Sequence, residues 1–528
     1  MTHLRIVTAL LIAWIVLTLP SNPASLSSIA ELQFPLELLL LAFGAVLLPG
    51  LAFSAFCIFA MLLIAIVLFL KLADIGTGAA FQRPFNPYLD IKIIVDGWNL
   101  LSGSVGRGEA AVWIGLAVLL LVAICLLFFW SLGDFRRIRG RARTVSAASA
   151  AILFAAGCIA LLSSSSAASA LSLNLAPYLN NRITMIRKSV QDLSAFEEEL
   201  ASDPISDIPP ATLFSSLRNT DVIVIFVESY GRTALEDGRY APTVAARLRE
   251  FEAELRGVGL EARSGWLTSP TVGGLSWLAH GALLSGLWTD SQARYDRMIA
   301  SDRKTLNALF RSAGWRTTAI MPAITMAWPE SGYFGYDSIR DSASLGYEGR
   351  PFNWVTMPDQ YTLSAFERLE RETSEAPLMA EIALISSHAP WTPIPTLVEW
   401  DRIGDGHIFD DQATSGDPPS VLWSDPERIR RQYLASIDYV LQTLGSYIRH
   451  YGDDKLFIIV GDHQPASVIT GDDASRDVPV HIMGTSDSLE QIGGWGWSAG
   501  MHPAPQLPAV RMDLFRERFV RAYSGTDS

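Results

Sequence analysis

The chain has 528 residues and a formal net charge of −13, and its length predicts more than one domain. Residues 1–175 hold ten Lys and Arg against seven Asp and Glu, a balance of +3, which leaves −16 for the remainder. This acidic balance argues against a nucleic-acid partner, because a phosphate backbone needs a basic face. Cys57, Cys125 and Cys158 all lie in apolar runs of the first part, so we expect small buried hydrophobic residues there and no disulfide in the second part.

Residues 1–170 are predicted to form an α-helical transmembrane bundle of about five spans. The apolar runs Leu4–Leu19, Ala110–Trp130 and Val145–Leu162 are each predicted to form one spanning helix. The run from Phe34 to Leu72 would reach roughly 58 Å as one helix, about twice the hydrocarbon thickness. Pro49-Gly50 supplies a turn near its middle, so we interpret this run as two helices in a tight hairpin with a short first arm.

The first apolar run has a second interpretation, because a signal peptide also combines a basic start with an apolar core. Arg5 lies at the start of this run, and the small residues Ala24 and Ala30 follow it. One arginine makes a thin basic region, so we favour a spanning helix and keep a cleaved signal peptide as the alternative.

The loop between the last two spans predicts the orientation of the bundle. It carries Arg136, Arg137, Arg139, Arg141 and Arg143, and loops rich in Lys and Arg stay in the cytoplasm. The last span then exits outward, so everything after it is predicted to lie outside the cytoplasm. No span carries a charged residue near its middle, which favours a membrane anchor over a transporter or channel.

The second part is predicted to be an α/β domain that begins after a linker. Residues 171–220 form the linker, in which Arg182–Leu200 has the spacing of an amphipathic helix and Asp203–Pro210 is rich in proline. In residues 221–528 strand and helix patterns alternate, which predicts a central, mostly parallel sheet flanked by helices. Apart from two strands treated next, we expect strands at Arg316–Met321, Leu378–Ser386 and Val478–Met483, and helices at Thr305–Ser312, Glu427–His450 and Met512–Tyr523.

Two apolar runs end abruptly in side chains that bind metals. Val222–Val227 is followed by Glu228, and Lys455–Gly461 is followed by Asp462 and His463. Each run is typical of a buried parallel strand, and ligands bind at the carboxyl ends of such strands. Two carboxylates and an imidazole suit one divalent ion, Mn²⁺ or Zn²⁺.

The segment Thr271–Gly286 offers a hydroxyl nucleophile for such a site. Gly273 and Gly274 form a turn before Ser276, and an apolar helical run follows, which places the Ser276 hydroxyl at a helix N-terminus. Unpaired N–H groups and the helix dipole favour an incoming phosphoryl or sulfuryl group there, and a nearby divalent ion would lower the pKa of the hydroxyl. On this segment alone, a plain N-cap role for Ser276 is equally supported.

A third strand end carries a histidine. His388 follows the predicted strand Leu378–Ser386 much as Glu228 and Asp462 follow theirs, so we predict that it donates a proton to a leaving oxygen. A lone histidine is more often structural, and this is the default interpretation for His280, His481 and His502.

Together these residues resemble the alkaline phosphatase and sulfatase superfamily. The resemblance is strongest to its membrane-anchored branch of lipoteichoic acid synthases and phosphoglycerol and phosphoethanolamine transferases, and it covers the spans, the linker and the extracytoplasmic domain. The motif Ser387-His388-Ala389-Pro390-Trp391 matches the Ser-His-x-Pro-aromatic signature of the family and implies catalysis by His388. The resemblance also implies a Ser276 nucleophile and a metal held by Glu228, Ser276, Asp462 and His463.

The sequence departs from members of this superfamily at three points, which limits the classes that it resembles. Leu278 and His280 stand where formylglycine sulfatases have Pro or Ala and Arg, which argues against that class. The second part has no cysteine, unlike the disulfide-strapped phosphoethanolamine transferases. Trp328-Pro329-Glu330 places an acid where lipoteichoic acid synthase has the arginine of a Trp-x-Arg element, which would suit a cationic head group. We therefore predict that Trp328, Glu330 and His280 bind substrate.

The resemblance implies a metal-dependent transferase in a bacterial-type cytoplasmic (inner) membrane, with its catalytic domain on the periplasmic side of the cell envelope. A membrane phospholipid would donate a phosphoglycerol or phosphoethanolamine head group to Ser276, and a glycan or lipid hydroxyl would then accept it. One alternative is a phosphodiester or sulfate ester hydrolase of the same superfamily, in which water takes the second step. Another is a catalytically silent membrane scaffold, which would have no need of acids at strand ends.

Overall fold

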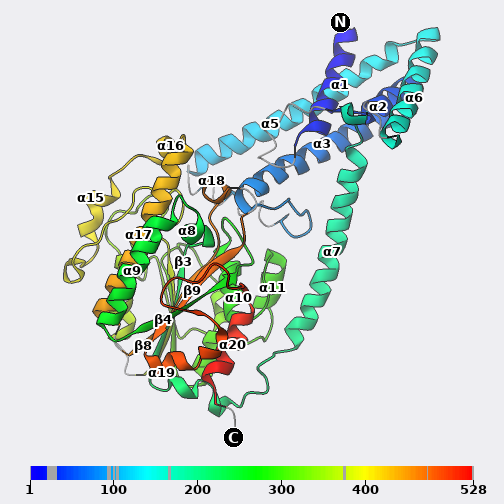
Figure 1. Ribbon diagram of the computed structural model, residues 1–528. Coiled ribbons are helices and arrows are strands. Elements are labelled where there is room, and N and C mark those ends of the chain that lie inside the picture. Colours follow the sequence, from blue (N-terminus) through cyan, green and yellow to red (C-terminus); the bar gives the residue numbers. More distant parts are fainter. Residues whose placement is uncertain are drawn as a thin grey trace. The chain divides into compact units, whose positions relative to one another are not determined.

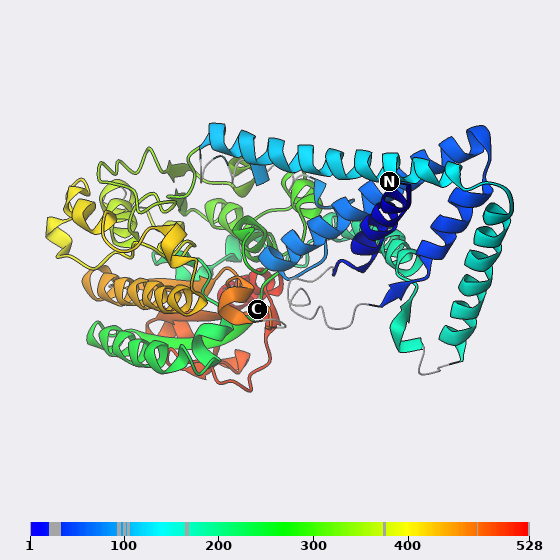
Figure 2. The same ribbon diagram turned by 90° about the horizontal axis from the view of Figure 1, so that it is seen from above.

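The computed structural model describes residues 2–20, 33–91, 97–98, 102, 106–163, 168–372, 376–452, 454–471 and 474–525. The chain divides into two compact units, the first made of Met1–Ala79 and Arg83–Asp192 and the second of Ala80–Gln82 and Leu193–Ser528 (Figure 1; Figure 2). The border at residue 192 falls inside the predicted linker. Ala24 and Ala30, which belong to the signal-peptide alternative, lie outside the described residues.

The first unit is built from apolar helices and one amphipathic helix. They are α1 (Thr2–Thr18), α2 (Glu37–Leu47), α3 (Gly50–Phe81), α5 (Arg107–Leu132), α6 (Gly140–Leu162) and most of the amphipathic α7 (Leu175–Ala201), with a short pairing of β1 (Phe34–Pro35) and β2 (Leu171–Ser172). Three described helices, Gly50–Phe81, Arg107–Arg137 and Gly140–Leu162, are long and apolar enough to cross a membrane. α1 and α2 are apolar but shorter, so the count of about five spans stays a prediction.

The turn predicted inside the second apolar run is present. α2 ends at Leu47 and α3 begins at Gly50, whose φ of +49° lies in the left-handed region that glycine tolerates. With 11 residues, α2 spans about 16 Å, roughly half of a hydrocarbon core. α3 continues beyond the predicted end at Leu72 to Phe81.

The last third of α3 carries two buried charged residues, Lys71 and Asp74. The Asp74 carboxylate accepts one hydrogen bond from the Phe85 N–H (2.9 Å) and one from the Tyr178 hydroxyl (2.9 Å). The Arg182 guanidinium also donates to Asp74 and completes a buried ion pair. These contacts tie the end of α3 to α7 within the first unit.

The second unit is built on one mixed sheet. Its described strands are β3 (Asp221–Val227), β4 (Glu261–Thr268), β5 (Arg316–Met321), β6 (Ser338–Asp341), β7 (Leu378–Leu384), β8 (Lys455–Gly461), β9 (Asp477–Gly484), β10 (Ser498–Ala499) and β11 (Val510–Arg511). Their order is β10-β4-β9-β8-β3-β7-β5-β6, with β11 beside β4. The run β8-β3-β7-β5-β6 is parallel, whereas the pairs β8–β9, β9–β4 and β4–β10 are antiparallel. The predicted parallel sheet therefore forms the part that carries the candidate site.

Helices cover both faces of this sheet (Figure 1). Side chains of β3 alternate between the faces, so Ile223 and Ile225 join one core while Val224 and Phe226 join the other. The first core contains α9 (Ala241–Gly257), α14 (Asp359–Phe366) and α17 (Pro426–Tyr451), and the second contains α10 (Ser276–Ser285), α12 (Leu306–Ser312) and α20 (Leu514–Tyr523). The shorter helices are α8 (Arg232–Glu236), α11 (Gln292–Ile299), α13 (Ser331–Phe334), α15 (Asp410–Ala413), α16 (Pro419–Leu422), α18 (Ser467–Thr470) and α19 (Ser486–Glu490).

The structure confirms the predicted strands as β5, β7 and β9, and the predicted helices as α12, α17 and α20. It also contains β4, which the sequence pattern did not indicate. Arg263 and Gly265 interrupt the apolar pattern of β4, and glycine weakens a strand signal. A Cβ at Gly265 would lie 2.5 Å from the Trp497 ring, so glycine is needed for this ring to pack on the strand.

Candidate active site and metal centre

Three neighbouring parallel strands end at the same edge of the sheet. The pairing of β3 with β8 sets Val227 beside Gly461, and the pairing of β3 with β7 sets Val227 beside Leu384. Glu228 and Asp462, the next residues of β3 and β8, are therefore level with each other. The Asp462 N–H donates to the Val227 carbonyl (3.2 Å), which continues this register past the strand end.

Glu228, Asp462 and His463 form a buried cluster that could hold a metal ion. One ligand atom from each lies within 4.8 Å of the others. His463 Nε2 is 3.1 Å from Glu228 Oε1 and 3.7 Å from Asp462 Oδ2. The structure thus brings together three of the predicted metal ligands from two strand ends that are far apart in the sequence.

Ser276 is the first residue of α10, and its side chain faces this cluster. Its Oγ donates to Glu228 Oε2 at 3.0 Å and lies 3.2 Å from His463 Nε2. The N-cap position belongs to Leu275, whose φ is +63°, and its side chain makes no capping hydrogen bond. The plain N-cap interpretation of Ser276 is therefore wrong, and its hydroxyl is free to act as the fourth ligand or as a nucleophile.

The other hydroxyls of this segment point elsewhere. Ser269 Oγ donates to the Asp462 carbonyl (2.6 Å), and Thr271 Oγ1 donates to the Gly274 carbonyl (2.7 Å). The predicted glycine turn is present, with φ values of +73° at Gly273 and +146° at Gly274. Of these three hydroxyls, only that of Ser276 is directed at the carboxylates.

Two buried carboxylates side by side give the site an excess of negative charge. Burial, and then the charge of Glu228, raises the pKa of Asp462 to about 7. Burial alone would also raise the pKa of Glu228, but the charge and hydrogen bond of His463 hold it well below its usual range. Burial disfavours a charged His463, yet Asp462 and Glu228 raise the pKa of its imidazole to about 9. A divalent cation would compensate this charge, and the carboxylate, hydroxyl and imidazole donors fit Mn²⁺ or Zn²⁺.

Backbone and side-chain contacts that carry no sequence signal of their own support the cluster. Ser229 adopts a φ of +58°, and its N–H donates to Asp462 Oδ1 (2.8 Å). The Tyr433 hydroxyl donates to the Ser229 carbonyl (3.0 Å), and Ser387 Oγ donates to the Glu228 carbonyl (2.5 Å). Positive φ at a serine is uncommon and is typical of functional sites, where the surroundings hold the backbone in place.

His388 follows β7, as predicted, and two residues that the sequence did not indicate hold it there. Its ring stacks on that of Trp354, with centroids 3.8 Å apart. Asp359 Oδ1 accepts hydrogen bonds from the N–H groups of Ile385 (2.8 Å) and Ser386 (3.0 Å), which fixes the loop that leads to His388. Burial raises the pKa of Asp359 to about 7.

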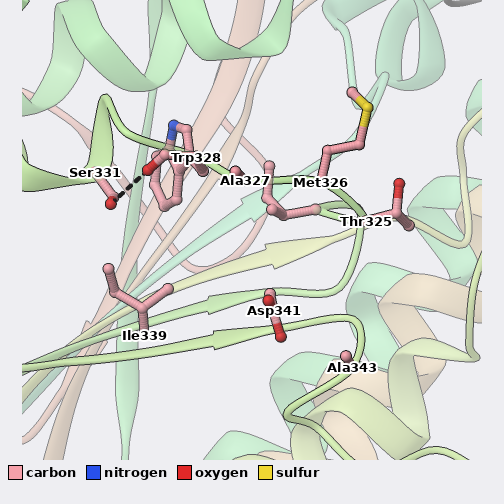
Figure 3. Close-up of a pocket in the computed structure, with 9 residues that line it drawn as sticks. Thr325, Met326, Ala327, Trp328, Ser331, Ile339, Asp341 and Ala343 are labelled. Carbon is pink, nitrogen blue, oxygen red and sulfur yellow. Dashed lines mark hydrogen bonds between the residues drawn. The ribbon is translucent and has the colours of Figure 1, made fainter.

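The predicted substrate residues Trp328 and Glu330 are directed to different places. Trp328 lines a cavity of about 480 Å³ together with Met326 and Asp341 (Figure 3). Glu330 is not among the residues that line this cavity. It stands at the start of α13, and after burial its charge is the next cause of the raised pKa of Tyr295.

His280 is the third predicted substrate residue, and it lies on α10 one turn after Ser276. Its Nδ1 is 2.8 Å from Glu381 Oε1, and its ring stacks on Phe226 with centroids 3.7 Å apart. Glu381 itself carried no predicted role, because a single acid within an apolar strand gives no sequence signal for a site.

Solved structures share this architecture. The integral membrane lipooligosaccharide phosphoethanolamine transferase A (EptA) from Neisseria meningitidis aligns over 98% of this chain and 95% of its own, with 15% identity and a TM-score of 0.50. The chain has the fold of this membrane-bound transferase. The lipoteichoic acid synthase LtaP from Listeria monocytogenes aligns over 55% of this chain and 71% of its own, with 13% identity and a TM-score of 0.38. The phosphoglycerol transferase GacH from Streptococcus pyogenes aligns over 55% and 72%, with 12% identity and a TM-score of 0.34.

No protein-family model and no curated protein sequence matches the chain. The resemblance to the membrane-anchored branch of the alkaline phosphatase and sulfatase superfamily is confirmed as a likeness of fold.

Proposed function

We propose that the chain is a metal-dependent, membrane-bound transferase that moves a phospholipid-derived phospho-head group to a glycan or lipid hydroxyl through a phospho-Ser276 intermediate. The observation that carries this proposal is the position of the Ser276 hydroxyl, 3.0 Å from Glu228 and 3.2 Å from His463. A hydroxyl at a helix start, aimed at a buried group of metal ligands, is the arrangement that a nucleophile needs.

Glu228, Ser276, Asp462 and His463 would hold one divalent ion, Mn²⁺ or Zn²⁺. When bound, such an ion lowers the pKa of a coordinated hydroxyl and neutralises charge on the transferring phosphoryl group. The first N–H groups of α10 add positive partial charge beside the same phosphoryl oxygens.

In the first step Ser276 Oγ, whose proton would pass to water when the metal binds, bonds to phosphorus as the alkoxide, and the bond from phosphorus to the diacylglycerol oxygen breaks. His388 donates a proton to that leaving oxygen. In the second step the acceptor hydroxyl gives its proton to His388 and bonds to phosphorus, and the bond to Ser276 Oγ breaks. The two displacements regenerate the enzyme and predict ping-pong kinetics.

Transfer is favoured over hydrolysis by the full-length likeness of fold to a protein described as a phosphoethanolamine transferase. A silent scaffold is disfavoured by the buried acids, because unneeded buried charge is costly. The deciding experiment follows a labelled lipid head group in membranes with wild-type protein and with Ser276→Ala. Label should move to a glycan or lipid product and, with a slow donor, remain on the Ser276 peptide. Release as a water-soluble phosphoester would indicate a hydrolase, and full turnover by Ser276→Ala would refute the mechanism.

The head group is proposed to be cationic, with Trp328 and Glu330 on the substrate side. Because Glu330 lies outside the cavity that Trp328 lines, the charge of Glu330 must act from its position near Tyr295. Glu330→Arg should then shift donor preference from phosphatidylethanolamine toward phosphatidylglycerol. An unchanged preference would remove Glu330 from the site.

The catalytic unit is proposed to lie on the outer, periplasmic side of a multi-pass inner-membrane protein. Three arginines between α5 and α6 (Arg136, Arg137 and Arg139) and two at the start of α6 (Arg141 and Arg143) support this orientation. A reporter that works only outside the cytoplasm should be active when fused after Ser528 and silent when fused at Gly140. The reverse pattern would exclude outer-leaflet lipids as donors.

A further inference from the structure

Glu381 is a buried carboxylate in the middle of an otherwise apolar strand. It is 1% exposed, and the other residues of β7 are leucine, methionine, alanine and isoleucine. A buried carboxylate is strongly unfavourable unless other groups satisfy it. Glu381 accepts hydrogen bonds from His280 Nδ1 (2.8 Å), from Asn307 Nδ2 (3.3 Å) and from the Tyr336 hydroxyl. In this assignment of the His280 tautomer, Nδ1 is the donor and the carboxylate accepts all three bonds.

The start of α10 has no side-chain cap, and the hydrogen bonds near it hold the preceding turn. Thr271 Oγ1 donates to the Gly274 carbonyl (2.7 Å), and the Gly273 N–H donates to the Gln464 carbonyl (2.8 Å). The three residues before Ser276 all have positive φ. The place of Ser276 therefore depends on this turn and on the contacts between α10 and the sheet.

His280 supplies such contacts on the same helical face as Ser276, one turn further along. Its bond to Glu381 ties α10 to β7, and its stacking on Phe226 ties α10 to β3. Phe226 and Glu228 are two residues apart and point to the same side of the sheet. His280 is thus held beneath the carboxylate that Ser276 contacts.

We propose that Glu381 and His280 are positioning residues whose hydrogen bond fixes α10, so that Ser276 Oγ stays within reach of Glu228 and His463. In this role His280 acts through Nδ1, and its Nε2 is not needed to bind substrate. The inference rests on the proposed function, because it takes Ser276 as the nucleophile. Loss of the anchor would displace Ser276, and a displacement of about 1 Å can cost about a hundredfold in rate.

The test compares Glu381→Ala, Glu381→Gln, His280→Ala and His280→Asn in the full-length protein. The asparagine amide can donate as Nδ1 does, but it has no counterpart of Nε2. Glu381→Ala and His280→Ala should lower kcat about a hundredfold, with donor KM and bound metal unchanged. Glu381→Gln keeps the volume of the side chain and should also lower kcat. It tests the hydrogen bond even if Glu381→Ala does not fold. His280→Asn should recover most of the lost kcat.

Glu367→Ala is the matched control. Glu367 is also buried and accepts from a buried tyrosine, Tyr447 (2.5 Å), whose side chain packs in the core on the opposite face of the sheet. This variant should leave kcat at the wild-type level. An equal loss of kcat in Glu367→Ala and Glu381→Ala would show a general stability effect and overturn the proposal.

Hydrogen exchange of residues 271–286 provides a readout that needs no turnover. Exchange should be faster in Glu381→Ala and His280→Ala, and near wild type in His280→Asn and Glu367→Ala. Absence of transfer by wild-type protein would refute the proposed function. The exchange result would still show whether Glu381 and His280 hold α10 in place. Unchanged exchange in Glu381→Ala, or an inactive His280→Asn whose α10 stays protected, would overturn the proposal.

Discussion

Two buried charged clusters of this protein differ in how well their charges are matched. In the membrane unit, Asp74 faces one guanidinium, that of Arg182, and two further donors, and Arg182 also donates to the Phe85 carbonyl. In the catalytic unit, Glu228 and Asp462 share one imidazole, that of His463. The first cluster is closed, because each charge meets its opposite. The second has two carboxylates and one imidazole. It therefore carries an excess of negative charge that a cation would neutralise.

This difference shows that buried charge by itself does not identify a functional site. A closed cluster holds two elements together, here α3 and α7, and needs nothing from outside. An open cluster is unfavourable until a ligand completes it, as indicated by the pKa of Asp462, which burial and then the charge of Glu228 raise. The following predictions test this distinction.

The largest expected effect concerns metal binding. Glu228→Ala and Asp462→Ala should each abolish turnover and lower bound divalent metal, because each removes a charged ligand. Asp74→Asn should retain the metal, since its cluster offers no vacancy for a cation. Elemental analysis of the purified full-length variants gives the metal content. Undiminished metal in both Glu228→Ala and Asp462→Ala would show that the ion binds elsewhere.

The second effect concerns stability in the presence of a chelator. Asp74→Asn should lower the free energy of unfolding by roughly 3 kcal/mol, because it leaves Arg182 buried without its counter-charge. Asp462→Asn should leave the metal-free protein equally stable or make it more stable, because burial and then the charge of Glu228 raise the pKa of Asp462 and make its ionised form unfavourable. Thermal unfolding in detergent measures both. Similar losses in the two variants would mean that the clusters do not differ as described.

The smallest effect concerns a neutral buried group, His481. The structure places it in the core, where Ser264 Oγ is 2.7 Å from Nδ1 and the Tyr230 hydroxyl is 3.2 Å from Nε2. Burial, and then the nearby His502, lowers the pKa of His481 to about 3. The unfolded chain takes up this proton near pH 6.5, so the stability is fully present above that pH and is lost as pH falls toward 3.

Between pH 7 and pH 5.5 the wild-type protein should therefore lose about 1 kcal/mol of stability through this group. His481→Gln should lack that part of the pH dependence. The measurement is the difference in the free energy of unfolding between the two proteins across this pH range. Titratable groups that both proteins share contribute equally and cancel in this difference. If the free energies of unfolding of the two proteins change with pH in parallel, the pKa of His481 is not lowered in the folded protein.

The sequence was informative wherever a short local pattern determines structure. Apolar runs that end in Glu228 and in Asp462-His463 predicted both strand ends, because buried parallel strands must be apolar throughout. The Gly-Gly turn predicted the start of the Ser276 helix, because only a few residues tolerate positive φ. The extension of α3 to Phe81 was not predicted, since the residues after Leu72 are less apolar and the partners of Asp74 lie further along the chain.

What the sequence determined by itself is the chemistry available at each strand end and the division into an apolar and an acidic part. Only the tertiary structure decided which of these side chains meet. It directed Ser276 to Glu228 and not to its own helix start, separated Glu330 from the cavity of Trp328, and paired His280 with Glu381 across 101 residues. Such pairings depend on strand order and helix packing, which are set by the burial of the whole core and not by any local pattern.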